Sequence, residues 1–198
     1  MVIERNKYLQ ELVSSRHNGL VKIITGMRRC GKSFLLFRLF RRFLEDNGVA
    51  DDHIVEMAFD DYTFKEFRNP DKFYAYVKGK ITDDRPYYIL LDEVQMLNEF
   101  EDVLNGLLHI PNADVYVTGS NAKFLSKDII TEFRGRGYQI HVAPLSFAEF
   151  MSVYGGDRED GWNEYLLYGG LPPVVLLKTD EEKMKLLNSL LAETYIID

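Results

Sequence analysis

The sequence predicts a three-layer α/β fold built on a parallel sheet, and three observations lead to that prediction. Apolar runs of strand length alternate along the chain with longer segments of helical pattern, which is the order that parallel strands and crossover helices produce. Residues 86–91 (Pro-Tyr-Tyr-Ile-Leu-Leu) are apolar without alternation, as expected of a strand covered on both faces. A glycine-rich loop, residues 26–33, separates the first strand from the helix that follows it.

The first two predicted elements flank this loop. Residues 20–25 (Leu-Val-Lys-Ile-Ile-Thr) are the first strand, and residues 32–46 are an apolar helix. Asn47-Gly48 follows that helix, and residues that tolerate positive φ commonly end a helix. The loop therefore joins a strand to the amino end of a helix.

The middle of the chain continues the alternation. Residues 53–59 are the second predicted strand, and Asn69-Pro70 caps the next helix, with proline in its first turn. After the third strand, residues 100–110 are predicted as a helix and residues 113–118 (Ala-Asp-Val-Tyr-Val-Thr) as the fourth strand. These segments continue the alternation of strand and helix that a parallel sheet requires.

The chain changes character after the fifth predicted strand, residues 138–143. Short helices interrupted by Gly-Gly and Pro-Pro breaks follow; they are predicted at residues 147–154, 162–168 and 180–195. We therefore expect a core domain over residues 1–143 and a helical subdomain over residues 144–198. The last helix reaches the end of the sequence without a cap, which predicts a fragment of a longer chain.

The composition of the chain excludes several classes of protein. The single cysteine allows no intramolecular disulfide, and one cysteine with four histidines makes a zinc site improbable. The amino terminus lacks the pattern of a signal peptide, and no apolar run approaches the roughly 18 residues that span a bilayer, so we expect a soluble, cytoplasmic protein without a membrane partner. A net charge of −7 argues against broad attraction to nucleic acid.

The glycine-rich loop matches the pattern G-x-x-x-x-G-K-[ST] at every fixed position. Glycines let the backbone wrap around phosphates with its N–H groups pointing inward, and the following helix presents its positive end to the same anion. Lys32 is expected to reach the β- and γ-phosphates, and Ser33 to ligate Mg2+. The residues expected to bind nucleotide here are Gly26, Met27, Arg28, Arg29, Cys30, Gly31, Lys32, Ser33 and Phe34.

Two carboxylates, Asp92 and Glu93, follow the buried third strand. Ligands of open α/β sheets bind at the carboxyl ends of the strands. Asp92 is the expected partner of Mg2+, and Glu93 the expected base that polarises the attacking water. Because kinases that phosphorylate metabolites need no water-activating acid, the pair favours hydrolysis over transfer to a small molecule.

The fourth strand ends in Val-Thr-Gly-Ser-Asn, where Thr118 and Ser120 are both candidates to orient water or contact the γ-phosphate. Helix capping by Ser120 is an alternative that can coexist with this role. Further along, Arg134 and Arg136 lie in a Gly-punctuated loop, and either could neutralise charge on a transferring phosphoryl group, in cis or from a neighbouring subunit. Arg136 is the preferred candidate, and a plain surface role is the alternative for both.

Several of these runs together resemble a group of poorly characterised bacterial and archaeal ATPases of the AAA+/STAND type. The resemblance lies in the run from Ile23 to Ser33, in Leu-Leu-Asp-Glu-Val-Gln at 90–95, in Thr-Gly-Ser-Asn-Ala at 118–122, in Gly-Arg at 135–136, in Pro-Leu-Ser-Phe-Ala-Glu-Phe at 144–150 and in Gly-Gly-Leu-Pro at 169–172. It covers essentially the whole chain in the family's order. Cys30 departs from the smaller residue that is common at its position, without endangering a loop that uses backbone groups there.

This resemblance implies a sheet with strand order 5-1-4-3-2, a helical subdomain in which Pro172 senses nucleotide, and a C-terminal domain beyond the present sequence. The resulting expectation is a Mg2+-dependent ATP hydrolase that acts as a nucleotide switch on ATP and ADP. The alternatives are a signalling module with negligible turnover and a DNA-associated ATPase that self-associates, with DNA or a protein client bound through the further domain. Adenine is expected because the sequence has no Asn-Lys-x-Asp motif for guanine.

Overall fold

The computed structural model describes residues 2–119 and 135–195, and it confirms the predicted α/β fold. Five strands form one all-parallel sheet in the order β2-β3-β4-β1-β5, which is the predicted order 5-1-4-3-2 from the other edge. The strands are β1 (Val21–Thr25), β2 (Ile54–Ala58), β3 (Tyr87–Asp92), β4 (Ala113–Thr118) and β5 (Gly137–His141).

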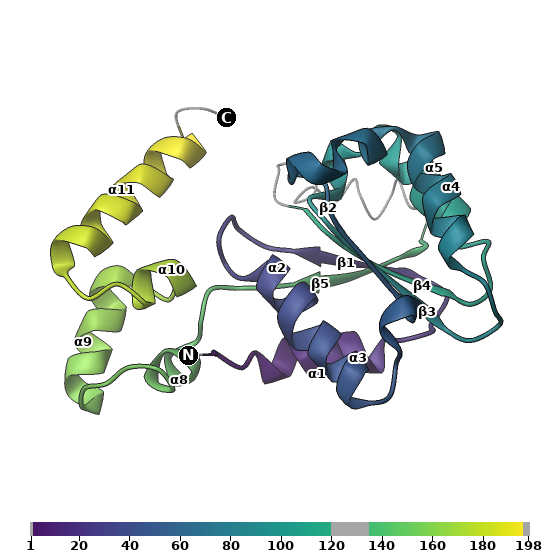
Figure 1. Ribbon diagram of the computed structural model, residues 1–198. Helices are drawn as coiled ribbons and strands as arrows, with labels where there is room; N and C mark the ends of the chain where they lie inside the picture. The colour runs from purple at the N-terminus through teal and green to yellow at the C-terminus, as the bar shows by residue number, and fades with distance from the viewer. Residues whose placement is uncertain (1, 120–134, 196–198) are drawn as a thin grey trace. The chain divides into compact units, whose positions relative to one another are not determined.

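Helices cover both faces of this sheet (Figure 1). On one face, α4 (Pro70–Lys80) and α5 (Phe100–Leu107) bury apolar side chains against alternate residues of the strands, as Phe73 and Leu104 do in the main core. On the other face lie α1 (Asn6–Ser14) and the helix that follows the glycine-rich loop. With both faces covered, every residue of β1 and β3 is buried, which explains the continuous apolar run at the start of β3.

The helix after the loop is helical over the predicted residues 32–46 but changes type along its length. It consists of α2 (Lys32–Phe34), the π-helical segment η1 (Leu35–Phe40) and α3 (Arg41–Asp46). The buried ring of Phe40 packs 4.5 Å from that of Tyr116 on β4. Gly48 has a φ of 82°, so the predicted stop after this helix is confirmed.

Other bounds complete the sheet-bearing part of the chain. Short 3-10 turns lie at η2 (Asp51–His53), η3 (Tyr62–Arg68) and η4 (Val94–Met96). Asn69 caps α4 as predicted, because its side chain accepts a hydrogen bond of 3.0 Å from the backbone N–H of Lys72. The helix α1 was not predicted: its buried face consists of only Tyr8 and Leu12, one turn apart, too short a pattern to read from sequence.

The chain divides into two compact units. One contains residues 5–26 and 32–142, which carry the sheet, and the other contains residues 1–4, 27–31 and 143–198. The helices of the second unit are α8 (Phe147–Met151), α9 (Arg158–Tyr168), α10 (Pro172–Val175) and α11 (Asp180–Tyr195). Among the described residues, no helix has the length and apolar character needed to cross a membrane.

Local polar contacts fix the helices of the second unit. Ser146 and Glu149 form a reciprocal capping box at the start of α8. Gly170 is required by a close approach, since a Cβ there would lie 2.2 Å from the backbone oxygen of Leu145, whose N–H donates to the Gly170 carbonyl at 2.7 Å. Lys183 on α11 pairs with Glu164 on α9 at 2.7 Å.

A buried ion pair lies inside the sheet. Lys22 on β1 and Asp114 on β4 are both buried and form a salt bridge. The Lys22 ammonium also donates to the carbonyl of Leu20 at 3.0 Å, and Asp114 accepts hydrogen bonds from the Tyr116 hydroxyl at 2.8 Å and the His17 backbone N–H at 3.1 Å. Burial lowers the pKa of Lys22, and Asp114 opposes that change.

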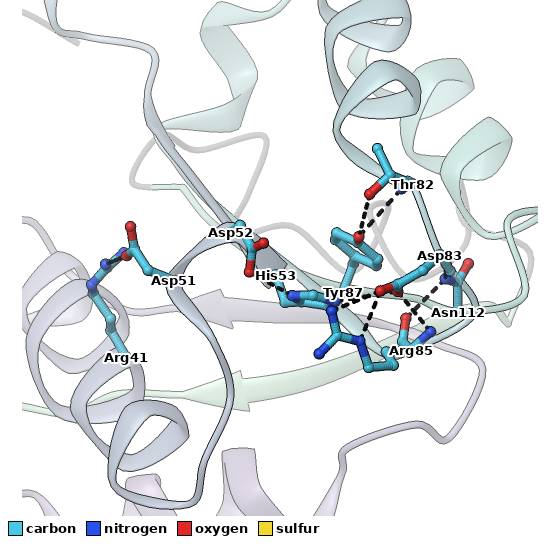
Figure 2. A network of polar contacts seen from close by, with 9 residues as sticks. All are labelled: Arg41, Asp51, Asp52, His53, Thr82, Asp83, Arg85, Tyr87 and Asn112. Carbon is cyan, nitrogen blue, oxygen red and sulfur yellow. Dashed lines mark hydrogen bonds and ion pairs between the residues drawn. The ribbon is translucent and has the colours of Figure 1, made fainter.

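A second polar network fastens the start of β2 to the connection between α4 and β3 (Figure 2). The buried imidazole of His53 lies between the carboxylates of Asp52, 2.7 Å from Nδ1, and Asp83, 3.2 Å from Nε2. Its ring stacks on that of Tyr87, the first residue of β3, with centroids 4.3 Å apart. One histidine thereby links two neighbouring strands at their amino ends.

Asp83 is the centre of that network. It accepts hydrogen bonds from the Arg85 backbone N–H at 2.9 Å and from Arg85 Nε at 2.7 Å. The side chain of Asn112 donates to the carbonyls of Asp83 and Arg85 at 2.8 and 2.9 Å, which joins the turn to the start of β4. The hydrogen bonds from Arg85 lower the pKa of Asp83 to about 2.

We predict that Asp114→Asn destabilises the fold by about 3 kcal/mol, because it leaves the charge of Lys22 buried and unpaired. Urea unfolding at neutral pH measures this loss. The double variant Lys22→Met, Asp114→Asn should recover most of the stability, since it removes the charge and keeps an acceptor for Tyr116. Equal losses in the single and the double variant would contradict the account.

We also predict a pH-dependent effect of Asp83→Asn. A carboxylate whose pKa is depressed in the folded state adds stability above its ordinary pKa, and that stability is lost as the pH falls toward about 2. Asp83→Asn should therefore lower the unfolding free energy at pH 7, and its difference from wild type should shrink between about pH 4 and pH 2. Asp84→Asn, at an exposed neighbour, is the control; a difference that is constant with pH would refute the prediction.

Candidate functional site

The parallel sheet brings the predicted site residues to one edge. The register pairs Ile23 of β1 with Val117 of β4, and Val117 with Leu91 of β3. The three strands therefore end together, so that the glycine-rich loop, the acid pair and Thr118 all emerge at their carboxyl ends. This is the edge at which ligands bind open α/β sheets.

Asp92 is the centre of the contacts at this edge. Its carboxylate is buried and accepts a hydrogen bond of 2.9 Å from the hydroxyl of Ser33, the second residue of α2. It accepts another from the hydroxyl of Thr118, the last residue of β4. Burial raises the pKa of Asp92, and the two hydroxyl donors act in the opposite direction.

Glu93 turns away from the strand that carries Asp92. It has a left-handed backbone, with a φ of 50°, which is uncommon for a residue with a side chain and is often found at functional sites. Its N–H donates to the Thr118 hydroxyl at 3.3 Å. Thr118 thus contacts both acids, and the side chain of Gln95 donates to the Glu93 carboxylate.

The glycine-rich loop has the backbone that its sequence predicts. Gly26 and Gly31 have φ values of 145° and 100°, where a side chain would be strained, and Arg29 also has a positive φ of 63°. The Cys30 N–H donates to the Met27 carbonyl at 3.3 Å. These conformations close the loop into a tight turn before α2.

Lys32 folds back across the start of this loop. Its side chain is buried, and Nζ donates to the carbonyl of Gly26 at 3.0 Å. Cys30 is buried as well, whereas Met27, Arg28, Arg29 and Phe34 are exposed. The ammonium group therefore lies at the mouth of the loop, where a phosphate chain would need a cation.

The chemistry of these side chains suits Mg2+ and a nucleotide phosphate. Mg2+ prefers oxygen ligands, commonly one or two carboxylates together with phosphates and water. Ser33 and Asp92 supply a hydroxyl and a carboxylate that already touch each other. Lys32 supplies the positive charge, and the amino end of α2 adds backbone N–H groups.

Arg136, by contrast, lies at the amino end of β1, away from this group. The carbonyl of Arg136 accepts a hydrogen bond of 2.9 Å from the N–H of Val21, at the amino end of β1, and the Arg136 guanidinium reaches Asn105 at 3.4 Å. At about 3.3 Å per residue, the length of β1 separates it from the loop by roughly 16 Å. Pro172 is the first residue of α10 in the helical unit, and Ser120 and Arg134 lie outside the described residues.

Gln95 is the member of this group that sequence reasoning did not identify. The signal was present, since it is a polar residue two positions after Glu93. Its contact with Glu93 depends on the turn η4, which reverses the chain within that short distance. The residues of this turn, Val94–Met96, carry no glycine or proline that would predict it.

Curated relatives of the chain come from a bacterium and an archaeon. An uncharacterized protein of Haemophilus influenzae is 33% identical over 181 residues, which are 88% of this chain and 45% of that protein. One from Methanocaldococcus jannaschii is 24% identical over 187 residues, 86% of this chain and 40% of that protein. The chain thus spans less than half the length of these two relatives.

Solved structures with the same fold include nucleotide-bound proteins. The Saccharomyces cerevisiae Hsp104–ADP complex aligns with a TM-score of 0.63 at 16% identity, covering 89% of this chain and 30% of that one. DnaA from Aquifex aeolicus with bound AMPPCP aligns with a TM-score of 0.54 at 16% identity, covering 92% of this chain and 59% of that one. At such identities the likeness shows the fold alone.

The sequence of the sheet-bearing part of the chain identifies its family. A family model described as an AAA domain matches residues 18–151, which include the glycine-rich loop, the acid pair and all five strands. That match covers more than half of the chain. The chain belongs to the AAA domain family and has its P-loop ATPase fold.

Proposed function

We propose that the chain binds ATP with Mg2+ at the carboxyl edge of β1, β3 and β4, and hydrolyses the ATP slowly as a nucleotide switch. The observation that carries the proposal is the contact of Asp92 with both Ser33 and Thr118, with Glu93 adjacent. Structural neighbours with ADP or AMPPCP bound support an adenine nucleotide. Membership of the AAA domain family supports nucleotide binding.

Each residue of the edge has a chemical role in this proposal. The loop N–H groups and Lys32 would hold the phosphates, and Ser33 and Asp92 would hold Mg2+, which when bound neutralises charge on the phosphate oxygens. Glu93 would accept a proton from water while the water oxygen bonds to the γ-phosphorus. The bond from that phosphorus to the bridging oxygen breaks, and ADP leaves with this oxygen.

The helical unit supports the switch part of the proposal. We propose residues 144–198 as a subdomain that responds to the bound nucleotide through Pro172. The close packing of Gly170 against Leu145 ties the turn before α10 to the segment that leaves the sheet. A change at this turn would therefore be passed to α8 and α9 rather than absorbed locally.

DNA binding by this part of the chain through Arg41 and Arg42, two arginines of α3, is less well supported. Arg41 pairs with Glu56 and Glu45 at 3.0 Å each, and with Asp51 (Figure 2). Arg42 lies 3.5 Å from Asp46. Carboxylates already neutralise this cluster, so it offers little net charge to a phosphate backbone.

We predict that Glu93→Gln lowers phosphate release from Mg-ATP by at least about 100-fold and leaves the Kd for ATP nearly unchanged, because it removes a base and not a phosphate contact. Lys32→Ala should weaken ATP binding itself. Phosphate release and fluorescent-nucleotide titration give the two quantities. Glu99→Gln is the matched control, since Glu99 is an exposed acid with a φ of 51° on the same connection.

The outcomes separate the candidate functions. Unchanged turnover in Glu93→Gln would refute the assignment of the base. Tight ATP binding by the wild type without phosphate release would favour a signalling module instead of a hydrolase. Turnover that rises strongly on addition of DNA would favour the DNA-associated ATPase.

Arg136 lies about one strand length from the glycine-rich loop of its own chain. We therefore predict that its guanidinium contacts the nucleotide phosphates bound to a second copy of the chain. Arg136→Ala should lose turnover and keep ATP affinity. An equimolar mixture of Arg136→Ala and Lys32→Ala should regain turnover, since one variant supplies the arginine and the other the loop. Mixed assemblies with no regained turnover would contradict action in trans.

A further inference from the structure

The side chain of Gln95 contacts Glu93 in one orientation only. Its nitrogen donates to the Glu93 carboxylate. An ionised carboxylate accepts hydrogen bonds and donates none, so the amide must present its NH2 group to Glu93. The carbonyl oxygen of Gln95 then faces the other way.

That carbonyl oxygen is buried and accepts no hydrogen bond from any residue that the structure describes. A buried acceptor without a donor destabilises a fold, and an apolar side chain of similar length would avoid the cost. The position of Gln95 is thus unfavourable for stability alone. Its NH2 group, by contrast, has a defined partner in the proposed base.

The turn between the two residues holds this contact in place. The N–H of Met96 donates to the Glu93 carbonyl at 3.0 Å, and the N–H of Leu97 donates to the Val94 carbonyl at 3.0 Å. Val94 and Leu97 are both buried in the core. The turn therefore presents Gln95 to Glu93 from a fixed backbone.

We propose that Gln95 is a positioning residue, which holds the Glu93 carboxylate in the orientation from which it takes the proton of the attacking water. The inference rests on the proposed hydrolysis and assigns Gln95 no proton transfer of its own. The water oxygen bonds to the γ-phosphorus, the proton passes to Glu93, and the amide keeps its hydrogens throughout. The buried carbonyl is the cost in stability of keeping the NH2 donor beside the base.

Gln95→Met tests this role, because methionine has similar length and no polar hydrogen. We expect kcat for ATP to fall by about tenfold or more, since a misplaced base loses much of its effect. We expect KM and the Kd for ATP to stay within about twofold, and the melting temperature to stay equal or rise, because the unpaired carbonyl is gone. Met96→Leu, at an exposed neighbour on the same turn, is the control.

A structural role for Gln95 would give a different result. In that case Gln95→Met would lower the melting temperature and the ATP affinity together with kcat, which would overturn the proposal. In a Glu93→Gln background, Gln95→Met should lower kcat by less than about twofold further, because the base that it positions is already absent. A full tenfold loss in that background would also overturn it.

The same measurements distinguish a failure of this inference from a failure of the proposed function. A hydrolysing wild type whose Gln95→Met variant keeps its kcat would refute the role of Gln95 alone. A wild type that binds ATP and releases no phosphate would refute the proposed hydrolysis, and the role of Gln95 with it.

Discussion

The buried carboxylate of Asp92 accepts hydrogen bonds from Ser33 and Thr118, and these two contacts join three separate elements at one point. Asp92 ends β3, Ser33 lies at the start of α2, and Thr118 ends β4. Only a parallel sheet with β4 between β3 and β1 brings the three together. The strand order, the covered faces and the tight loop before α2 therefore all serve the position of this one carboxylate.

Charged side chains have different partners at the candidate site and in the rest of the fold. Lys22 and Asp114 neutralise each other inside the sheet, and His53 lies between two carboxylates at the amino ends of β2 and β3. At the carboxyl edge, Asp92 has two neutral hydroxyl donors, and burial raises its pKa. A site arranged in this way gains from a cation that binds to the carboxylate. Charges are thus paired inside the sheet and at the amino ends of β2 and β3, whereas neutral donors hold the Asp92 carboxylate at the carboxyl edge.

Local signals in the sequence were sufficient for the strands and for the residues at the carboxyl edge, whereas the strand order came from the family resemblance. The glycine-rich loop has fixed spacing, and β3 is an apolar run that ends in two acids. The helix α1 was missed because only Tyr8 and Leu12 make its buried face. Gln95 was missed because its contact with Glu93 depends on how η4 turns. The distance of Arg136 from its own loop needed the register of β5 on β1, which resemblance and spacing do not supply.

The decisive experiment is a crystal structure of the protein with Mg2+ and a non-hydrolysable ATP analogue. We expect Mg2+ bound to the Ser33 hydroxyl beside Asp92, with Lys32 Nζ moved from the Gly26 carbonyl to the phosphates. We also expect the Glu93 carboxylate to face the γ-phosphate. Phosphates bound away from the loop, or Lys32 still on Gly26 beside a bound nucleotide, would refute the proposed nucleotide site.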